Sequence, residues 1–232
     1  MIPHYNVVIL TPGHSMEARY VLSLVHTIKE LDVLGVSWAY SSAASSDVSI
    51  AREQTVLGNT LRSINKKFDK PLSSMCTYDK LFLIDSDIYW NANDFLQLYY
   101  SEEDLISGAY LQLDGETTTL LESVDDTNSL SGFNTGMRAL SKENLRSKSN
   151  PFEVAAAGLG FMCIKEGVLE AIERPWFKHE SVEYKLSDNE SNIDMFSEDI
   201  SFLRKVKKAG FKVYADPTVR VGHVKKTNVE WY

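Results

Sequence analysis

The stretch LFLIDSDIYW, residues 81–90, places two carboxylates where an apolar run ends. Burying an isolated carboxylate costs several kcal/mol, roughly, so Asp85 and Asp87 need something that compensates their charge. Two hard oxygen ligands at one point suit a divalent ion such as Mg²⁺ or Mn²⁺, which can also bind phosphate oxygens. A solvated turn after a strand is the plainer interpretation, and an Asp-x-Asp pattern alone does not separate the two.

A second acidic pair and a histidine near the end of the chain each have a structural and a functional interpretation. Glu198 and Asp199 open the segment SEDISFLRKVKKAG, where carboxylates are stabilised by the dipole of a helix start. One of the two can instead act as a general base. His223, in VRVGHV, is either a structural residue near a strand end or a further ligand for Mn²⁺.

Arg52 and two glycines complete the candidate residues. Arg52 lies in IAREQ, on a predicted helix, and is either solvated or directed to a ligand. Gly158 and Gly160 either permit close strand packing or let the backbone approach a ligand. The short GLG pattern does not match a complete dinucleotide fingerprint.

The elements that must position these residues follow from hydrophobic periodicity. Short apolar runs predict strands, and apolar residues at helical spacing predict helices. In the first helix the apolar positions are Val21, Leu24, Val25, Ile28 and Leu31, and Ser15 is a candidate cap. Asp47 is a candidate cap for the second helix. The predicted order is strand 5–10, helix 15–31, strand 35–42, helix 47–68 and strand 78–85.

This β-α-β-α-β order predicts an α/β fold, with a mostly parallel, Rossmann-like central sheet flanked by helices. Ligands of such sheets bind beyond the carboxyl ends of the strands. We therefore expect Asp85, Asp87 and residues 11–13 to share one edge.

The rest of the chain is less regular. Residues 104–113 predict another strand. Residues 114–150 read as an insertion, as flexible loops or as a β-hairpin, covering the site. A strand through Gly158 and Gly160 and a short helix are expected within 152–172. A helix follows from Ser197, ended by Gly210, and strands lie within 211–224. We expect one domain, divided into residues 1–113, the irregular segment 114–150 and residues 151–232.

The composition of the chain limits the classes of molecule that it is expected to bind. The chain has 232 residues, 44% of them hydrophobic, and a net charge of −8, which is ordinary for a globular protein. This acidic balance argues against nucleic acid as a partner and against anionic membranes. The sequence shows neither a secretion signal nor a run of about 18 apolar residues that would span a membrane. Cys76 and Cys163 are expected to be free thiols, and the expected location is the cytoplasm.

Together these motifs resemble the GT-A family of nucleotide-sugar-dependent glycosyltransferases. The resemblance lies in the order of a strand ending in TPG, a helix with IAR, the strand LFLIDSD and the segment AAGLGFMCI. The block FSEDISFLRKVKKAGFKVYADPTVRVGHV is its most specific part. The match covers nearly the whole chain except residues 114–151.

The resemblance implies a nucleotide-binding half at 1–113 and an acceptor and metal half at 151–232. It also implies a donor site with a metal ion, Mn²⁺ or Mg²⁺. Asp87 and His223 would bind the metal, and Asp85 would bind the ribose or reach the metal through water. The nucleotide pocket would be lined by Thr11, Pro12, Gly13, Arg52 and Ser86.

The resemblance also implies an acceptor side. Gly158 and Gly160 would lie beside the donor sugar and the acceptor, which is a glycan or another hydroxyl compound. Asp199 would be the base of an inverting enzyme, which we favour over a retaining one, and Glu198 is the second choice. Glu53 departs from the family, since many relatives carry Asn at that position.

The expected function is therefore a metal-dependent transfer of sugar from a nucleoside diphosphate sugar, with UDP favoured over GDP. Two alternatives stay open. One is a sugar-phosphate nucleotidyltransferase, although TPGHSMEAR has a single glycine where a Gly-rich first loop is expected. The other is a non-catalytic nucleotide- or glycan-binding module, because a fold does not fix a function.

Overall fold

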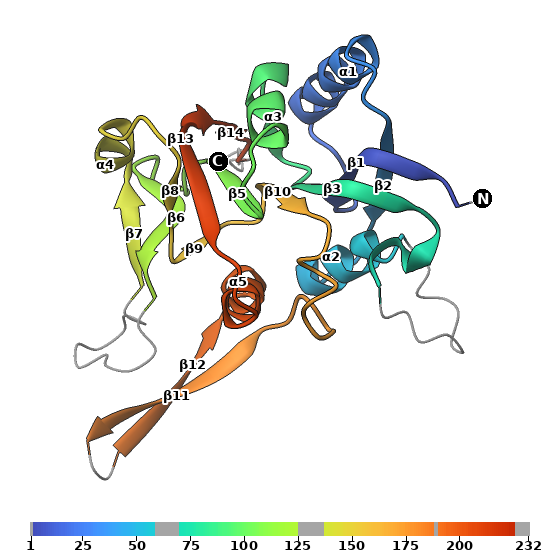
Figure 1. The fold of residues 1–232 in the computed structure, drawn as a ribbon. Coiled ribbons are helices and arrows are strands. Elements are labelled where there is room, and N and C mark those ends of the chain that lie inside the picture. The colour runs from blue at the N-terminus through green and yellow to red at the C-terminus, as the bar shows by residue number, and fades with distance from the viewer. Residues whose placement is uncertain (1, 59–69, 125–136, 188–189, 226–232) are drawn as a thin grey trace, which may run out of the picture.

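The computed structural model describes residues 2–58, 70–124, 137–187 and 190–225. A seven-stranded sheet runs through the centre of the molecule, with helices on both faces (Figure 1). Its strands, in spatial order, are β2 (Trp38–Ala43), β1 (His4–Pro12), β3 (Thr77–Ile84), β10 (Phe161–Lys165), β5 (Leu105–Ala109), β13 (Val213–Arg220) and β8 (Phe152–Glu153).

The sheet is mostly parallel, as predicted. Strand β1 pairs in parallel with β2 and β3, and β5 pairs in parallel with β13. Strand β10 is antiparallel to both β3 and β5, so those two strands point the same way. Strand β8 is antiparallel to β13 at the sheet edge. The carboxyl ends of β1, β3 and β5 therefore share one edge, where the predicted site residues begin.

Alternating side chains of the central strands supply the two halves of the core. Leu10 and Leu83 face one side, where α2 (Val48–Val56) and α5 (Glu198–Lys208) cover them. Ile9 and Phe82 face the other side, beneath α1 (Ala18–Val33) and α3 (Ala92–Tyr99). Strands buried on both faces explain why these segments are continuous apolar runs in the sequence.

The N-terminal cap and the packing face of α1 differ from the prediction. The N-cap residue is Glu17, which makes no capping hydrogen bond with its side chain, so Ser15 does not cap the helix. Val21 and Val25 are exposed, and the buried positions are Tyr20, Ser23, Thr27 and Leu31. Ser23 and Thr27 face the core because they hydrogen-bond Trp90, through its backbone and its indole nitrogen.

Helices α2 and α5 start where the sequence predicts. Asp47 accepts hydrogen bonds from the backbone of Ser49 and Ile50 at the start of α2. Helix α2 ends at Val56, and the predicted extension over residues 59–68 lies outside the described residues. Ser197 caps α5 and Gly210 follows its end with a left-handed φ of 97°, as the capping rules require.

The second half of the chain adds smaller elements around this core. A three-stranded sheet is formed by β6 (Thr117–Ser123), β7 (Arg138–Ser141) and β9 (Ala156–Ala157). Helix α4 (Lys142–Arg146) directly follows β7 in the chain. Strands β11 (Glu180–Ser187) and β12 (Glu190–Phe196) form a hairpin that projects from the body (Figure 1). The remaining elements are η1 (Pro71–Ser74), β4 (Ile88–Tyr89) and β14 (Gly222–His223).

Two predictions for this half are wrong in detail, and one element was not predicted. Gly158 and Gly160 lie in the turn between β9 and β10 and not within a strand. Residues 166–171 form turns where a short helix was expected. The β11–β12 hairpin was not predicted, since its polar sequence lacks the alternation of a half-buried strand.

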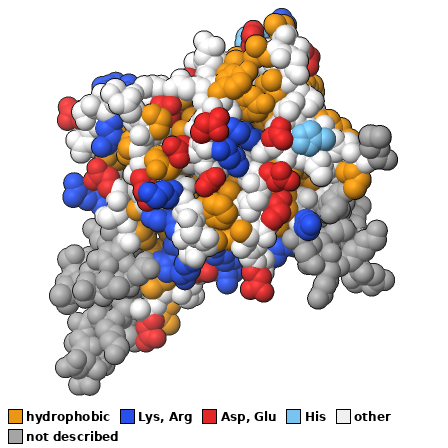
Figure 2. All heavy atoms as spheres, in the orientation of Figure 1, with side chains coloured by type: hydrophobic (Ala, Val, Ile, Leu, Met, Phe, Trp, Pro, Cys, Tyr) orange, Lys and Arg blue, Asp and Glu red, His pale blue; other side chains and the backbone are white. Residues whose placement is uncertain are grey.

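The described helices are all too short or too polar to span a membrane. On the face shown in Figure 2, acidic and basic side chains are interspersed, and hydrophobic side chains gather around α1 and α3. Val21, Leu22 and Val25 of α1 are among the exposed hydrophobic residues.

Candidate active site

Arg52 lies at the centre of the candidate site and joins three carboxylates from distant parts of the chain. Its side chain, on α2, is only 3% exposed. Nη1 donates to Glu198 and, over 2.7 Å, to Oδ1 of Asp199, both in the first turn of α5. Nη2 lies 3.0 Å from each carboxylate oxygen of Asp85, directly after β3. The Asp-Ser-Asp turn and the acidic pair thus meet at one buried guanidinium.

One cation facing three carboxylates perturbs the proton affinities of the cluster. Burial acts to lower the pKa of Arg52, but the three negative charges outweigh it and keep the pKa above its usual range. Burial raises the pKa of Asp199 to about 6, and the charges of Glu198 and Asp85 add to this, although Arg52 opposes it. Asp199 therefore has the proton affinity of a base that works near neutral pH.

The two acidic residues at the start of α5 differ in their surroundings. The Glu198 side chain is 9% exposed, binds Arg52, and has His179 Nε2 at 3.8 Å. The Asp199 side chain is 22% exposed, and its second oxygen accepts from the backbone N–H of Leu159 at 3.2 Å. Asp199 is the more accessible of the two carboxylates.

Asp87 and His223 form the second part of the site. Pairing of β4 with β14 places His223 opposite Ile88, so Nε2 of His223 lies 3.1 Å from Oδ2 of Asp87. Lys225 Nζ lies 3.3 Å from the same oxygen. Burial acts to raise the pKa of Asp87, but His223 and Lys225 together hold the pKa below its usual value.

The contacts of His223 fit a cation between it and Asp87. Nδ1 faces the carbonyl oxygen of Leu111 at 3.2 Å, so it carries the proton and donates. In neutral imidazole this leaves a lone pair on Nε2 beside a carboxylate, which is stable only if Nε2 is also protonated or if a cation binds both groups. A histidine that donates its other N–H to a backbone carbonyl is also the usual arrangement of a metal ligand.

Asp85 is placed differently from Asp87. Both of its oxygens contact Arg52, and its backbone N–H donates to Gly160. Among the residues that the structure describes, no three Asp, Glu, His or Cys side chains gather in a way that could hold a metal ion. The residues that fit a divalent ion are thus Asp87 and His223, with the remaining ligands left to water or phosphate, as Mg²⁺ often has them.

The end of β1 packs against the Asp-Ser-Asp turn. Gly13 has a left-handed φ of 140°, and a Cβ atom there would lie 2.7 Å from Oγ of Ser86. Only glycine lets these two turns approach so closely. Thr11 is buried, and its hydroxyl contacts that of Tyr20 on α1, so its side chain points into the core. Pro12 is the last residue of β1.

Gly158 and Gly160 make room for Tyr110, a buried residue that the sequence analysis missed. A Cβ atom at either position would collide with the Tyr110 hydroxyl. That hydroxyl accepts from the backbone N–H of Gly160 at 3.0 Å. Burial, aided by Asp85 and Asp199, raises the pKa of Tyr110, so it stays neutral. Its position just after β5, at the carboxyl edge of the sheet, was the available signal.

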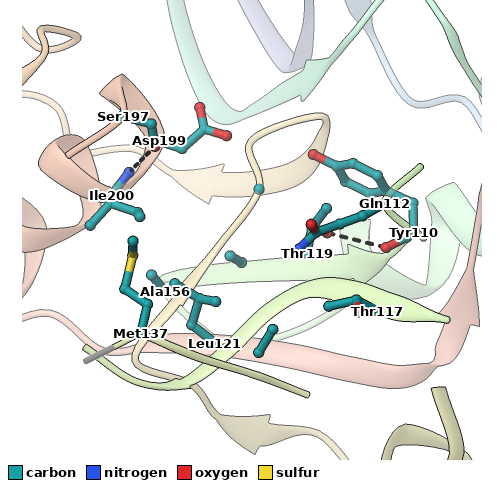
Figure 3. Close-up of a pocket in the computed structure, with 13 residues that line it drawn as sticks. Tyr110, Gln112, Thr117, Thr119, Leu121, Met137, Ala156, Ser197, Asp199 and Ile200 are labelled. Carbon is teal, nitrogen blue, oxygen red and sulfur yellow. Dashed lines mark hydrogen bonds between the residues drawn. The ribbon is translucent and has the colours of Figure 1, made fainter. Parts of the chain in front are cut away.

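A cavity of about 420 Å³ opens beside Asp199. Figure 3 shows Asp199 of α5 and the capping residue Ser197 on one wall, and Tyr110 and Gln112 on the opposite wall. The other lining residues come from the small sheet and its neighbours: Thr117, Thr119, Leu121, Met137, Ala139, Ala156, Ala157, Gly158 and Ile200. This mixture of apolar and hydroxyl side chains, with one carboxylate, is typical of a small-molecule site.

Glu53, the departure from the family pattern, has a structural position. Its carboxylate accepts from Nε of Arg174 at 2.7 Å and from the backbone N–H groups of Trp176 and Phe177. It therefore holds the segment after β10 against α2. Lys225 was also not predicted, although it lies only two residues after His223.

Comparisons with known proteins give little further guidance. No protein-family model matches the sequence, and neither does a curated protein. The crystal structure of A197 from STIV is similar over 99% of this chain and 97% of its own, with 16% identity and a TM-score of 0.48. GalNAc-T7, determined with UDP, GalNAc and Mn²⁺, is similar over 97% of this chain, with 12% identity and a TM-score of 0.41.

The chain corresponds to 44% of the length of GalNAc-T7. TM-scores below 0.5 are too low for either likeness to carry an argument about activity. The class is instead defined by the chain's own structure: an α/β fold whose mostly parallel sheet bears an acidic, arginine-centred site at the carboxyl ends of its strands.

Proposed function

We propose that this chain is a metal-dependent glycosyltransferase that moves a sugar from a nucleoside diphosphate sugar to an acceptor hydroxyl. The observation that carries the proposal is the position of Arg52, which connects the Asp85 carboxylate to Asp199, a residue that lines a cavity. Such an arrangement keeps a donor-side group and a candidate base at a fixed separation. UDP is favoured over GDP because of the sequence resemblance alone.

On the donor side, Asp87 and His223 would hold Mn²⁺ or Mg²⁺. When bound, the ion would act as a Lewis acid that neutralises charge on the diphosphate. The residues themselves do the positioning, because the β4–β14 pairing and the Leu111 carbonyl fix the ring of His223. Lys225 adds a positive charge next to Asp87, which also favours an anionic donor.

On the acceptor side, Asp199 would accept the proton of the acceptor hydroxyl. In an inverting reaction the acceptor oxygen bonds to the anomeric carbon as the bond from that carbon to the diphosphate oxygen breaks, and the nucleoside diphosphate leaves. The pKa of Asp199, about 6, leaves it ionised at neutral pH and still basic enough to take the proton. The cavity lined by Tyr110, Thr119 and Ser197 would bind the acceptor.

Arg52 would position both carboxylates and set the pKa of Asp199. Its positive charge opposes the burial that raises this pKa, so that the base is ionised in the working pH range. Its contacts with Asp85 and Glu198 fix the guanidinium in place. It is a positioning residue in this scheme, since it acts through the residues that it holds.

The experiment is donor hydrolysis and donor binding with a panel of nucleotide sugars, with Mn²⁺ and with chelator. We expect UDP to raise the melting temperature with Mn²⁺ and much less without it, because a ligand stabilises a fold by mass action. His223→Ala should remove most of the rise in melting temperature that depends on Mn²⁺. Its matched control is His26→Ala, an exposed α1 residue.

Two outcomes would contradict the proposal. Equal stabilisation by UDP with Mn²⁺ and with chelator would exclude the metal bridge. Donor binding without turnover of any sugar nucleotide, with or without a glycan acceptor, would favour a non-catalytic binding module. That alternative has one observation in its favour, since Asp85 and Asp87 already have protein cations as partners.

A further inference from the structure

A second cavity, of about 180 Å³, lies on the opposite face of the β7–β6–β9 sheet from the Asp199 cavity. Successive residues of β6 point to opposite faces of a strand. Thr117 and Thr119 line the Asp199 cavity, and Thr118 lines the second one. The two cavities are therefore separated by the small sheet, and among the described residues Tyr110 alone borders both.

Three basic side chains surround this second cavity. Lys142 and Arg146 come from the two ends of α4, and Arg220 comes from the end of β13. Figure 1 shows α4 beside that end of β13. The chain has a net charge of −8, so a local group of three cations around one small cavity is not expected from composition.

These cations are poorly neutralised by the protein. Lys142 has Glu116 at 3.7 Å, and that carboxylate is 77% exposed. Arg220 donates through Nε to the carbonyl oxygen of Pro217 at 2.8 Å, which orients its guanidinium. Among the described residues, neither Arg146 nor Arg220 lies within ion-pair distance of a carboxylate. Their guanidinium groups are exposed and accessible to a ligand.

The wall of the cavity is otherwise mostly apolar, formed by Ala109, Leu111, Leu145 and Val221, with Thr118 as a buried hydroxyl residue. The Thr118 hydroxyl donates to the carbonyl oxygen of Leu140, so it is already satisfied. A ligand for this space needs a small apolar part against the wall and a negative group at the arginines. Arginine forks bind phosphate and carboxylate with paired hydrogen bonds.

We propose that this cavity, the α4 cavity, binds a small organic anion: a phosphate or carboxylate group between Arg146 and Arg220, with a short apolar part against Leu111 and Val221. Its volume is below the usual range of roughly 300–1,000 Å³ for ligand pockets, so the ligand is small. The site lies on the other face of the small sheet from the proposed acceptor cavity, with Tyr110 on the border of both. Its occupancy is therefore measurable whether or not the chain transfers sugar.

The test is calorimetric titration of the full chain with butyl phosphate and with inorganic phosphate. We expect butyl phosphate to bind more tightly, because the apolar wall takes the alkyl group. Arg146→Gln and Arg220→Gln should each weaken butyl phosphate binding roughly tenfold or more, as expected for a charge-assisted hydrogen bond. Arg220→Lys should lose part of the affinity, since a point charge replaces a fork.

The matched control is Arg138→Gln, which removes the same charge from β7, where Arg138 is 74% exposed and pairs with Glu122. It should leave binding unchanged. The proposal would be overturned if the wild type did not bind butyl phosphate. It would also be overturned if all four variants, the control included, bound it with equal affinity. A third measurement uses phosphatidic acid vesicles. If the chain bound these vesicles but not butyl phosphate, the three cations would belong to a lipid-binding surface, and the small-anion proposal would be overturned.

Discussion

Replacing Arg52 with methionine removes the cation from the centre of the candidate site and keeps much of the side-chain volume. Three carboxylates then face one another without a compensating charge: Asp85, Glu198 and Asp199. Breaking a buried ion pair by removing one partner costs about 3–5 kcal/mol, because the remaining charge stays buried. We expect Arg52→Met to reduce the free energy of unfolding by this amount at pH 7.

The loss should depend on pH, and the sign follows from Asp199. Its pKa in the folded protein, about 6, lies above the ordinary 3.8, so the fold favours the protonated form. The stability gained from that protonation is complete at low pH and is lost as the pH rises through about 6. Arg52 opposes the raised pKa, so its removal raises the pKa of Asp199 further. The difference between variant and wild type should therefore be larger at pH 8 than at pH 5.

The assay is urea unfolding of both proteins from pH 5 to pH 8, with the slope m compared to confirm that the unfolded states match. The control is Arg138→Met, which breaks an exposed ion pair and should cost about 0.2–1 kcal/mol at every pH. The free energy of unfolding of Arg52→Lys should lie between those of the wild type and Arg52→Met, because one ammonium cannot contact three carboxylates as the guanidinium does. A loss for Arg52→Met equal to that of Arg138→Met, or independent of pH, would refute this account of the cluster.

Three other substitutions test single groups. Asp199→Asn should lower turnover by roughly 10²- to 10⁴-fold with donor affinity unchanged by calorimetry, and wild-type turnover should fall as the pH drops below about 6; normal turnover of the variant would exclude Asp199 as the base. Glu53→Gln should cost about 1–3 kcal/mol in urea unfolding, since it weakens the contacts to Arg174 and two backbone N–H groups; a neutral result would show that these contacts are dispensable. Gly158→Ala should lower the melting temperature, and Tyr110→Phe in the same chain should restore part of it by removing the hydroxyl that the new methyl meets; no rescue would place the strain elsewhere.

Local sequence signals determined much of the fold. The order of strands and helices over residues 1–85 follows from apolar runs and helical periodicity, because both are short-range properties of the chain. The start of α5 at the acidic pair Glu198 and Asp199 and its stop at Gly210 follow from signals within one turn of helix, the helix dipole and the C-terminal glycine. The same kind of signal identified Asp47 as the cap of α2.

Packing faces were less predictable, because burial depends on neighbours that are distant in sequence. Periodicity in α1 points to Val21 and Val25 as core residues, yet both are exposed. The core side of α1 contains Ser23 and Thr27 because Trp90, more than 60 residues later, supplies their hydrogen-bond partners. Polar residues become suitable core residues only when such a partner is present.

The candidate site shows the same division. Sequence motifs identified Arg52, Asp85 and Asp199 separately, with a solvated helix face as the plainer interpretation of Arg52. Only the tertiary structure joined them, since 33 and 147 residues separate Arg52 from the two carboxylates. The raised pKa of Asp199 likewise comes from burial and from charges across the sheet edge. Sequence determines which groups are present, whereas their distances and dielectric surroundings, and hence their chemistry, are decided by the long-range packing of the sheet and its helices.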